Sequence, residues 1–226
     1  MPPRRRTRRR PHGLVILAVL IVLALSACGG DEKEARARPL PQDEVALRPG
    51  EYRVEDFEPS FSLRVGKGWR TWPPQVSDAL LLTWGKTAVL VFANIQEVYK
   101  PSKTGTANVV EAPEDMVGWF QHHPYLRTSK PEPVTVGGAE GVRFDVTTEP
   151  MPEDYMGTCG TDCVDIFRPS SGGSKDLRAG DKARVTVLEN VKGETVTIAF
   201  ASRPSEFGEF APEAQKVVDS VKWRGS

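Results

Sequence analysis

The first 27 residues constrain the fold more than any other part of this chain, because they separate a predicted export signal from the part of the chain that can form a domain. Six arginines lie within residues 4–10, an apolar run covers residues 14–25, and small residues follow it. This order is typical of a secretory signal peptide. A membrane-spanning helix needs about 20 apolar residues, and residues 14–27 supply only 14. The sequence therefore predicts that residues 1–27 are removed on export and take no part in the fold.

Cys28 follows this segment directly, in the sequence Leu25-Ser26-Ala27-Cys28-Gly29. That sequence resembles the lipobox of bacterial lipoprotein precursors. The resemblance implies transfer of a diacylglyceryl group to the Cys28 thiol, cleavage before Cys28 and acylation of the new amino group. Two or three acyl chains hold a protein stably on a bilayer, whereas one holds it only marginally. We therefore expect Cys28 to anchor the mature chain to the lipid bilayer, on the extracytoplasmic face of the cell membrane.

The expected mature chain is acidic, although the whole chain is neutral. The full sequence has 30 basic and 30 acidic residues, and the first 27 residues hold six of the basic ones. The mature chain keeps 24 basic and 30 acidic residues, a formal net charge of −6. This charge argues against a nucleic-acid partner, which would need a basic face, and against electrostatic adhesion to anionic lipid. The 199 residues that remain after cleavage are typical of one domain with a tether.

Two cysteines, Cys159 and Cys163, remain once Cys28 is acylated. An even number of cysteines in an exported chain favours a disulfide, and Gly160 permits the turn that a small ring requires. A zinc site is the alternative, but two cysteines do not complete a four-ligand coordination shell. We predict a disulfide between Cys159 and Cys163. It should stabilise the fold by about 2 kcal/mol at most, because the ring is short.

The mature chain is predicted to consist of a tether and one domain. Residues 28–50 begin with the lipidated cysteine and two glycines, continue with mixed charges and show no apolar periodicity, so we expect a flexible tether. Residues 51–226 are predicted to form a single α+β domain. Within it, residues 149–182 are rich in Gly, Pro and Ser and include both remaining cysteines. We expect a long loop there, either functional or disordered.

Apolar periodicity within the domain predicts about six strands and two main helices. Alternation of apolar and polar residues indicates half-buried strands, and glycine-containing turns between apolar runs indicate hairpins. The predicted strands cover residues 61–65, 79–82, 88–95, 141–147, 183–188 and 195–200. One helix is predicted from Pro113 to Pro124. The last helix is predicted to start at Pro212, with an apolar stripe of Ala214, Val217, Val218 and Val221. The predicted fold class is α+β, an antiparallel sheet of about six strands with helices packed on its faces.

The domain resembles the PsbP and Mog-type family. The similarity lies in Phe61-Ser62-Leu63-Arg64-Val65 before Gly68-Trp69, in Pro133-Val134-Thr135-Val136-Gly137-Gly138, and in the closing helix that runs to Ser220-Val221-Lys222. It covers most of residues 55–223. The resemblance implies an α/β/α sandwich. It also implies a non-enzymatic scaffold that is used for assembly or for binding partners.

No motif for catalysis or for a cofactor stands out in the chain. A Ser-His-acid hydrolase commonly uses a Gly-x-Ser-x-Gly elbow, and the sequence contains none. His122 and His123, at the predicted end of a helix, are expected to interact with the helix dipole as imidazolium groups rather than to bind a metal. Asp154, Asp162 and Asp165 lack the EF-hand spacing and are expected to form a solvated acidic loop. We therefore predict no catalytic residue, no metal and no cofactor.

Three side chains are candidates for contact with a partner. Trp72, before Pro73-Pro74, is the best tryptophan for an exposed contact, whereas Trp69 and Trp119 are expected in the core. Tyr155 and Asp162, in the cysteine-containing loop, are the other candidates. The predicted function is a non-catalytic binding, assembly or accessory module of the cell envelope, with an unidentified protein partner. Two alternatives remain open, a cell-envelope hydrolase-like enzyme and a small-ligand sensor.

Overall fold

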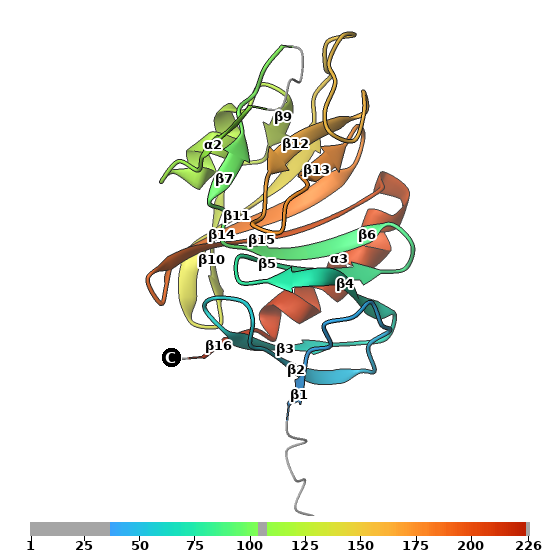
Figure 1. The fold of residues 1–226 in the computed structure, drawn as a ribbon, viewed down its shortest axis with the longest axis vertical. Helices are drawn as coiled ribbons and strands as arrows, with labels where there is room; N and C mark the ends of the chain where they lie inside the picture. The colour runs from blue at the N-terminus through green and yellow to red at the C-terminus, as the bar shows by residue number, and fades with distance from the viewer. Residues whose placement is uncertain (1–36, 104–107, 225–226) are drawn as a thin grey trace, which may run out of the picture. The chain divides into compact units, whose positions relative to one another are not determined.

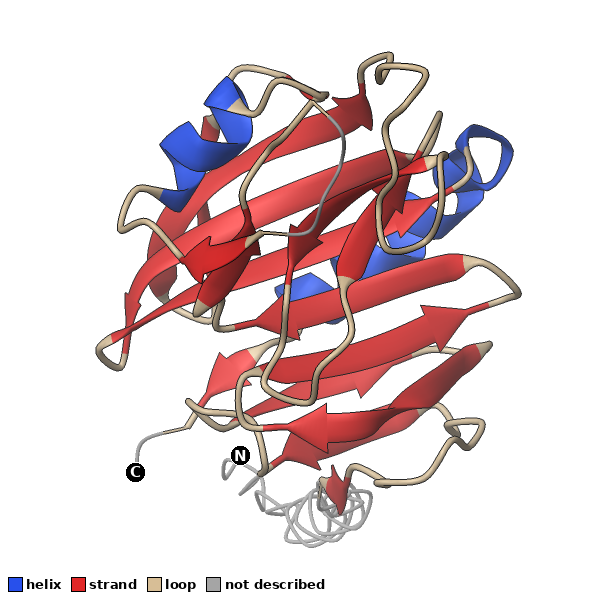
Figure 2. Ribbon diagram, turned by 45° about the horizontal axis from the view of Figure 1, so that its top comes forward, coloured by secondary structure: helices blue, strands red, loops and turns tan. Residues whose placement is uncertain are grey.

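A computed structural model describes residues 37–103 and 108–224, and its described residues are built mainly from strands (Figure 1). The predicted signal peptide, Cys28 and the first part of the predicted tether lie outside these residues. From Ala37 onward the strands form three sheets (Figure 2).

An eight-stranded antiparallel sheet lies in the middle of this unit (Figure 1). Seven strands follow the order β10-β11-β14-β15-β6-β5-β4, and β9 pairs with the end of β11. Tight turns with glycine at positive φ join the predicted hairpins, at Gly85, at Gly137-Gly138 and at Gly193. The strands are β4 (Trp69–Val76), β5 (Ala79–Trp84), β6 (Ala88–Ala93), β9 (Leu126–Thr128), β10 (Glu132–Val136), β11 (Ala139–Thr148), β14 (Lys182–Val191) and β15 (Glu194–Ser202).

Two four-stranded sheets pack on the two faces of the central sheet. The first has the order β1-β2-β3-β16, and the second has the order β13-β12-β7-β8. In the first sheet the strands are β1 (Arg38–Pro39), β2 (Gly50–Val54), β3 (Phe61–Val65) and β16 (Lys222–Trp223). In the second they are β7 (Glu97–Tyr99), β8 (Val109–Glu111), β12 (Cys163–Phe167) and β13 (Lys175–Arg178).

Successive side chains of the central strands enter two separate cores. In β6, Leu90 and Phe92 join the core that includes β2 and β3, whereas Val91 and Ala93 contact the core that includes β7 and β12. Neighbouring residues of a strand point to opposite faces of its sheet. A strand that is covered on both faces is therefore almost continuously apolar. The strand predicted at residues 88–95 is present as β6, from Ala88 to Ala93, and is covered on both faces.

Two helices are described, α2 (Met116–His122) and α3 (Pro204–Asp219). The Asp115 carboxylate caps α2 by accepting a hydrogen bond of 2.7 Å from the Gly118 backbone N–H. Met116 and Phe120 are buried in the core that contains β12, whereas α3 packs in the core that contains β3. Neither of these described helices is both long and apolar enough to span a membrane.

The last helix starts eight residues earlier than predicted, at Pro204 instead of Pro212. Both prolines fit the first position of a helix. The apolar stripe explains why the helix starts at the earlier proline. Phe210 lies one turn before Ala214 and is also buried, so the stripe extends toward Pro204. The predicted stripe is confirmed for Ala214, Val217 and Val218, which are buried on α3. Val221 is also buried, but it lies after the end of the helix at Asp219.

The predicted arrangement of one six-stranded sheet with helices on its faces is not matched. The described chain is mostly β and mainly antiparallel, but residues 61–65 do not join the central sheet. They form β3, which pairs with β2 and β16. Much of each face of the central sheet is therefore covered by strands. Alternation along β3 predicts that it is a strand, but it does not select its neighbours.

The prediction that residues 149–182 form one long loop is wrong for the second half of this segment. This segment contains β12 and β13, which pair antiparallel. Val164, Ile166 and Leu177 lie in the core beneath them. The glycines and prolines that suggested a loop lie outside these two short strands. Their number conceals the mainly apolar run from Cys163 to Phe167, in which only Asp165 is polar.

The packed chain also begins before the predicted end of the tether at residue 50. Arg38 and Pro39 pair with β2, and Leu40 and Leu47 are buried. The Leu47 backbone N–H donates a hydrogen bond of 2.8 Å to the Trp69 carbonyl oxygen. Residues 37–50 are thus part of the domain. Two buried leucines attach this irregular segment to the domain. Because the leucines follow no periodic pattern, the sequence did not indicate that the segment is packed.

Gly141 in β11 is expected to tolerate no side chain. A Cβ at this position would overlap the Val187 carbonyl oxygen and lie 2.9 Å from the Leu188 Cα, both in the backbone of β14. We expect Gly141→Ala to lower the free energy of unfolding by about 1–3 kcal/mol, as overpacking does. Urea unfolding followed by circular dichroism measures this. Gly66→Ala is the matched control, because its Cβ would meet only the Glu213 side chain, at 3.6 Å. Equal stability of the two variants would contradict the prediction.

Candidate functional site

The segment that carries the two cysteines lies against the β12–β13 pair. Cys159 and Cys163 are joined by a disulfide, as the sequence predicts, and their Cα atoms are 6.1 Å apart. Cys159 is exposed, whereas Cys163 is fully buried at the start of β12. The backbones of Gly157 and Gly160 exchange hydrogen bonds of 2.9 and 3.1 Å. The ring is therefore held by its backbone as well as by its sulfur atoms.

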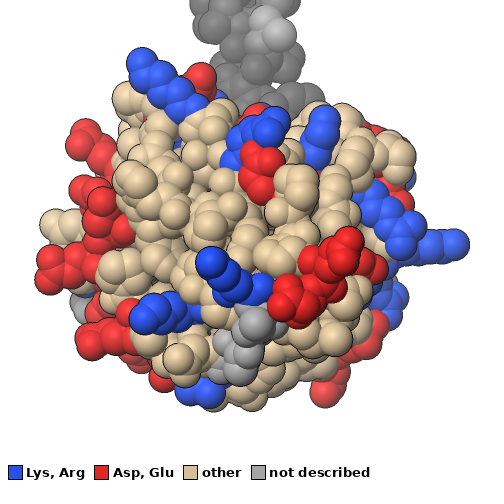
Figure 3. Space-filling model, turned by 90° about the horizontal axis from the view of Figure 1, so that it is seen from above, with Lys and Arg blue, Asp and Glu red and all other residues tan. Residues whose placement is uncertain are grey.

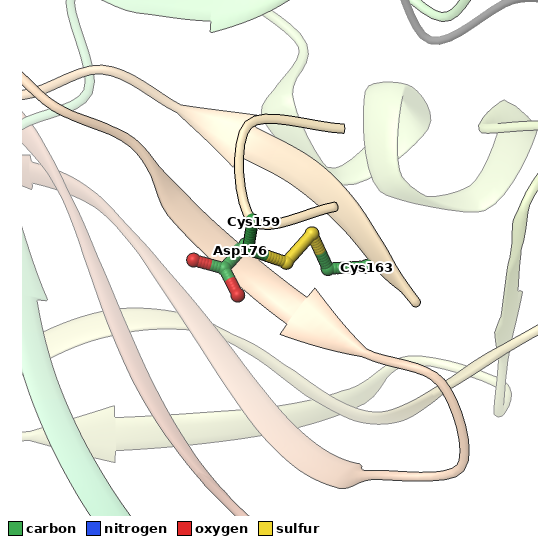
Figure 4. Close-up of side chains that lie close together, drawn as sticks. All are labelled: Cys159, Cys163 and Asp176. Atoms are coloured by element: carbon green, nitrogen blue, oxygen red, sulfur yellow. A yellow bond between two sulfur atoms is a disulfide. The ribbon is translucent and has the colours of Figure 1, made fainter. Parts of the chain in front are cut away.

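Asp176 of β13 lies beside this disulfide (Figure 4). A carboxylate oxygen of Asp176 and the Sγ atoms of Cys159 and Cys163 all lie within 4.8 Å of one another. Strand alternation explains the placement. Val164 and Leu177 enter the core, so their neighbours Cys163 and Asp176 face away from it. Sequence reasoning missed Asp176, because the pairing of β12 with β13 brings it to the cysteines.

Asp165 anchors the segment that carries the disulfide. It lies directly opposite Asp176 in the β12–β13 pair, and only 4% of its surface is exposed. Its carboxylate accepts a hydrogen bond of 2.9 Å from the Thr158 backbone N–H and another from the Thr158 hydroxyl. A buried carboxylate requires such partners. The prediction that Asp165 belongs to a solvated acidic loop is therefore wrong.

Charged groups of both signs lie near Asp176, beside the disulfide. Burial raises the pKa of the Asp176 carboxyl; Arg178 lowers this pKa, Asp165 raises it and Lys175 lowers it. Although its pKa is raised, the Asp176 side chain keeps an exposed surface, so its carboxylate can reach a solute. Asp162, within the ring, is also exposed. Two exposed carboxylates, those of Asp162 and Asp176, therefore lie at or beside the disulfide ring.

The three predicted contact residues differ in their exposure. Trp72 is 48% exposed on β4, an edge strand of the central sheet, and Asp162 is exposed in the disulfide ring. Tyr155, however, is only 4% exposed, and its ring packs against Tyr125 with centroids 5.1 Å apart. Tyr155 is thus a core residue, and the prediction that it contacts a partner is wrong. Its sequence neighbours are exposed, and nothing in the local pattern signals its burial.

Trp69 and Trp119 follow the prediction to different degrees. Trp69 is fully buried, as expected. Trp119 is partly buried and packs against the core that contains β12.

The two histidines at the end of α2 have different environments. His122 is exposed, and its Nδ1 lies 2.7 Å from the Gly118 carbonyl oxygen. His123 is 5% exposed, and its Nδ1 accepts a hydrogen bond of 3.3 Å from the Tyr125 backbone N–H. Burial lowers the pKa of His123 to about 4. The predicted imidazolium is therefore wrong for His123, which is neutral at pH 7.

A cavity of about 220 Å³ lies between the N-terminal side of α2 and the β14–β15 hairpin. Its polar lining includes Asn94, Gln96, Glu114, Glu194 and Thr197. Asn94 donates a hydrogen bond of 2.8 Å to Glu194. The Thr197 hydroxyl is buried and has no hydrogen-bond partner among the described residues. The lining contains acidic but no basic side chains, so a small neutral or cationic molecule suits it better than an anion.

Charged side chains of both signs surround the face shown in Figure 3. They enclose a broad area without charged side chains. This face does not show the continuous basic surface that binds nucleic acid.

Known structures show a distant likeness to this chain. No family model matches it, and no curated protein matches it. It is similar to cyanobacterial PsbP (CyanoP) from Synechocystis, with 11% identity over 83% of this chain and 100% of that chain, and a TM-score of 0.40. It is also similar to LpqN, described as involved in cell envelope biogenesis of Mycobacterium tuberculosis. That match has 10% identity over 81% of this chain and 91% of that chain, and a TM-score of 0.37. Likeness at this level assigns neither a family nor a function.

Reduction of the disulfide is expected to cost the fold little. The ring is short, so its loss should lower the free energy of unfolding by about 2 kcal/mol at most. Urea unfolding with and without a phosphine reductant measures the difference. The double variant Cys159→Ser/Cys163→Ser is the control and should not respond to the reductant. Loss of cooperative unfolding on reduction would contradict the prediction.

Proposed function

We propose that this protein is an extracytoplasmic lipoprotein that acts as a non-catalytic binding or assembly module of the cell envelope. One observation carries the proposal, the sequence Leu25-Ser26-Ala27-Cys28-Gly29 directly after a basic and then an apolar segment. The lipobox that this sequence resembles implies acylation of Cys28. Acyl chains on Cys28 would hold the domain at the outer face of the cell membrane.

The start of the packed unit supports a position close to the bilayer. Ala37 follows Cys28 by nine residues, and a fully extended chain of this length spans about 30 Å at most. β1 follows Ala37 directly, so the sheet that contains β1 lies closest to the anchor along the chain. The proposed anchor therefore limits how far the domain can move from the membrane.

Trp72 supports a binding role. Its exposed side chain lies on β4 beside Pro73 and Pro74. Prolines lack a backbone N–H, so this part of the edge is poorly suited to pairing with another strand. Aromatic side chains are enriched in protein interfaces. We therefore propose that an envelope protein would contact the Trp72 side chain rather than the backbone of β4.

Cys28→Ser tests the anchor. In a bacterium that processes lipoproteins, we expect the wild-type chain to incorporate labelled palmitate and to fractionate with membranes after cleavage. The Cys28→Ser chain should take up no label and remain an uncleaved or mislocalised precursor. Gly30→Ala, which leaves the residues around the cut unchanged, is the control and should behave as wild type. Normal processing and membrane retention of Cys28→Ser would overturn the proposal.

Trp72→Ala tests the binding role. The lipidated protein is cross-linked in intact membranes, and captured proteins are identified by mass spectrometry. Met156→Ala is the control, because Met156 is also an exposed apolar side chain but lies in the cysteine-containing segment. We expect the recovery of a specific partner to fall for Trp72→Ala and to stay unchanged for Met156→Ala. Equal recovery with both variants would contradict a contact at Trp72.

The unpartnered Thr197 hydroxyl favours a second candidate function, a small-ligand sensor. Such a ligand would occupy the 220 Å³ cavity that Thr197 helps to line. Screening small amines and neutral polar compounds by thermal melting tests the idea. A compound that raises the melting temperature of the wild type but not of Thr197→Val would support it. Equal shifts in both proteins would exclude binding at this hydroxyl.

A further inference from the structure

We propose that reduction of the Cys159–Cys163 disulfide opens a site for a thiophilic divalent cation such as Zn²⁺. Its three protein ligands would be the two cysteine thiolates and the Asp176 carboxylate. The two cysteines alone do not make such a site, but the pairing of β12 with β13 brings the third ligand to them. The three ligand atoms already lie within 4.8 Å of one another.

The spacing of these atoms fits tetrahedral zinc. Zinc lies about 2.3 Å from thiolate sulfur and about 2.0–2.2 Å from carboxylate oxygen. Two ligand atoms of a tetrahedral site are then roughly 3.5–3.8 Å apart, and the Asp176 oxygen already lies within 4.8 Å of both sulfur atoms. The main movement needed is separation of the two sulfur atoms once their bond is broken. Three protein ligands leave the fourth position to water, as in open zinc sites.

Contacts that do not involve sulfur hold the ligands in place after reduction. Cys163 belongs to β12 and Asp176 to β13, and their strands are paired. The Ala179 backbone N–H donates a hydrogen bond of 2.6 Å to the Asp162 carbonyl oxygen, next to Cys163. On the other side of the ring, Thr158 is bound to the buried Asp165. A site built on paired strands keeps its ligands close to the required geometry.

The chemistry requires a reductant and releases protons. A dithiol supplies two electrons and two hydrogens, so the Cys159–Cys163 bond breaks, two thiols form and the dithiol becomes a disulfide. Binding of the cation then displaces one proton from each thiol, because the thiolate is the ligand. The oxidised protein offers no thiolate and should not bind the cation at this site.

The identity of the ligands selects the class of cation. Thiolates favour zinc and other thiophilic metals, whereas magnesium and calcium prefer oxygen ligands. Two thiolates and the carboxylate carry three negative charges, and a divalent cation removes most of their mutual repulsion. Asp162 adds a further negative charge at the ring, while Arg178 lies opposite Cys163 in the strand pair and offsets part of it.

Cobalt binding tests the proposal with a direct spectroscopic signal. The full chain with Cys28→Ser, in detergent and without oxygen, leaves the ring cysteines as its only thiols. After reduction by dithiothreitol and removal of the reductant, we expect one Co²⁺ to bind and to give a near-ultraviolet thiolate-to-cobalt absorption. Zn²⁺ should displace it, because zinc binds such sites more tightly than cobalt. The oxidised chain should show no such absorption.

Matched variants separate the carboxylate ligand from general charge. Asp176→Asn should weaken Co²⁺ binding about tenfold or more, since changes even outside the ligand shell cost 10–100-fold. Asp162→Asn removes the same charge within the ring, at an exposed side chain, and should weaken binding no more than about threefold, since salt screens it. Circular dichroism confirms that each variant is folded. Absence of cobalt absorption in the reduced chain, its presence in the oxidised chain, or equal affinities of the two variants would overturn the proposal.

Discussion

Replacing Phe210 by alanine is expected to lower the free energy of unfolding by about 3–5 kcal/mol, the usual cost of removing a buried aromatic ring. Phe210 is fully buried on α3. Its ring centroid lies 5.9 Å from each of those of Trp69, Trp84 and Phe200. These three rings belong to β4, β5 and β15, so Phe210 joins the helix to three strands of the central sheet. Its removal leaves a cavity that the surrounding strands cannot fill.

Urea unfolding, followed by tryptophan fluorescence and by circular dichroism, measures this loss. Glu209→Ala is the matched control, because Glu209 precedes Phe210 on the same helix but is exposed. Its effect should stay within about 0.5 kcal/mol, as for most surface substitutions. A domain of this size is stable by about 5–15 kcal/mol, so Phe210→Ala should remove a large share. If both variants unfold at the same urea concentration, α3 is peripheral to the fold.

The burial of His123 is expected to make the protein less stable in mild acid. The pKa of His123 is about 4 in the folded protein, below the value of about 6.5 expected when the chain is unfolded. Below pH 6.5 the unfolded chain takes up a proton at this residue and the folded chain does not. Stability is therefore fully present above pH 6.5 and falls until about pH 4, by up to about 3 kcal/mol.

Unfolding free energies at several values between pH 7.5 and pH 4 measure this contribution. His123→Asn replaces the ring by a side chain that does not titrate but can accept a hydrogen bond from Tyr125. The variant should lose less stability than the wild type as the pH falls, although its stability at pH 7.5 is lower. His122→Asn, at an exposed neighbour, should keep the wild-type pH dependence. A His123→Asn curve parallel to that of the wild type would contradict the burial argument.

The hairpins and the last apolar stripe could be predicted because their signals are local. Glycines near residues 85, 137 and 193 stand between alternating or apolar runs, and each is a turn between paired strands. Ala214, Val217 and Val218 repeat at helical spacing and are buried in α3. Periodicity and turn chemistry act between near neighbours. They therefore predict a strand or a helix well, but they carry no information on which distant element it packs against.

Distant contacts account for the predictions that were wrong. Residues 61–65 form a strand as expected, yet their partners β2 and β16 place them in a separate sheet. Tyr155 is buried in the core that contains β12, and His123 is buried beside Trp119 and Tyr125, although neither position stands out in the sequence. Burial changes the role of each. Tyr155 becomes a packing residue, and His123 loses the charge that a helix end would favour.

The sequence alone predicts an export signal with Cys28 and an acidic mature chain, and it correctly predicted the pairing of Cys159 with Cys163 and the main hairpins. Each depends on residue type, composition or short spacing. Only the tertiary structure decided that three sheets form instead of one, that the packed chain begins at Ala37, and that Asp176 lies beside the disulfide. These features depend on which strands pair across long stretches of chain. The pairing of strands depends on the burial of whole sheet faces, so no short segment of the sequence encodes it.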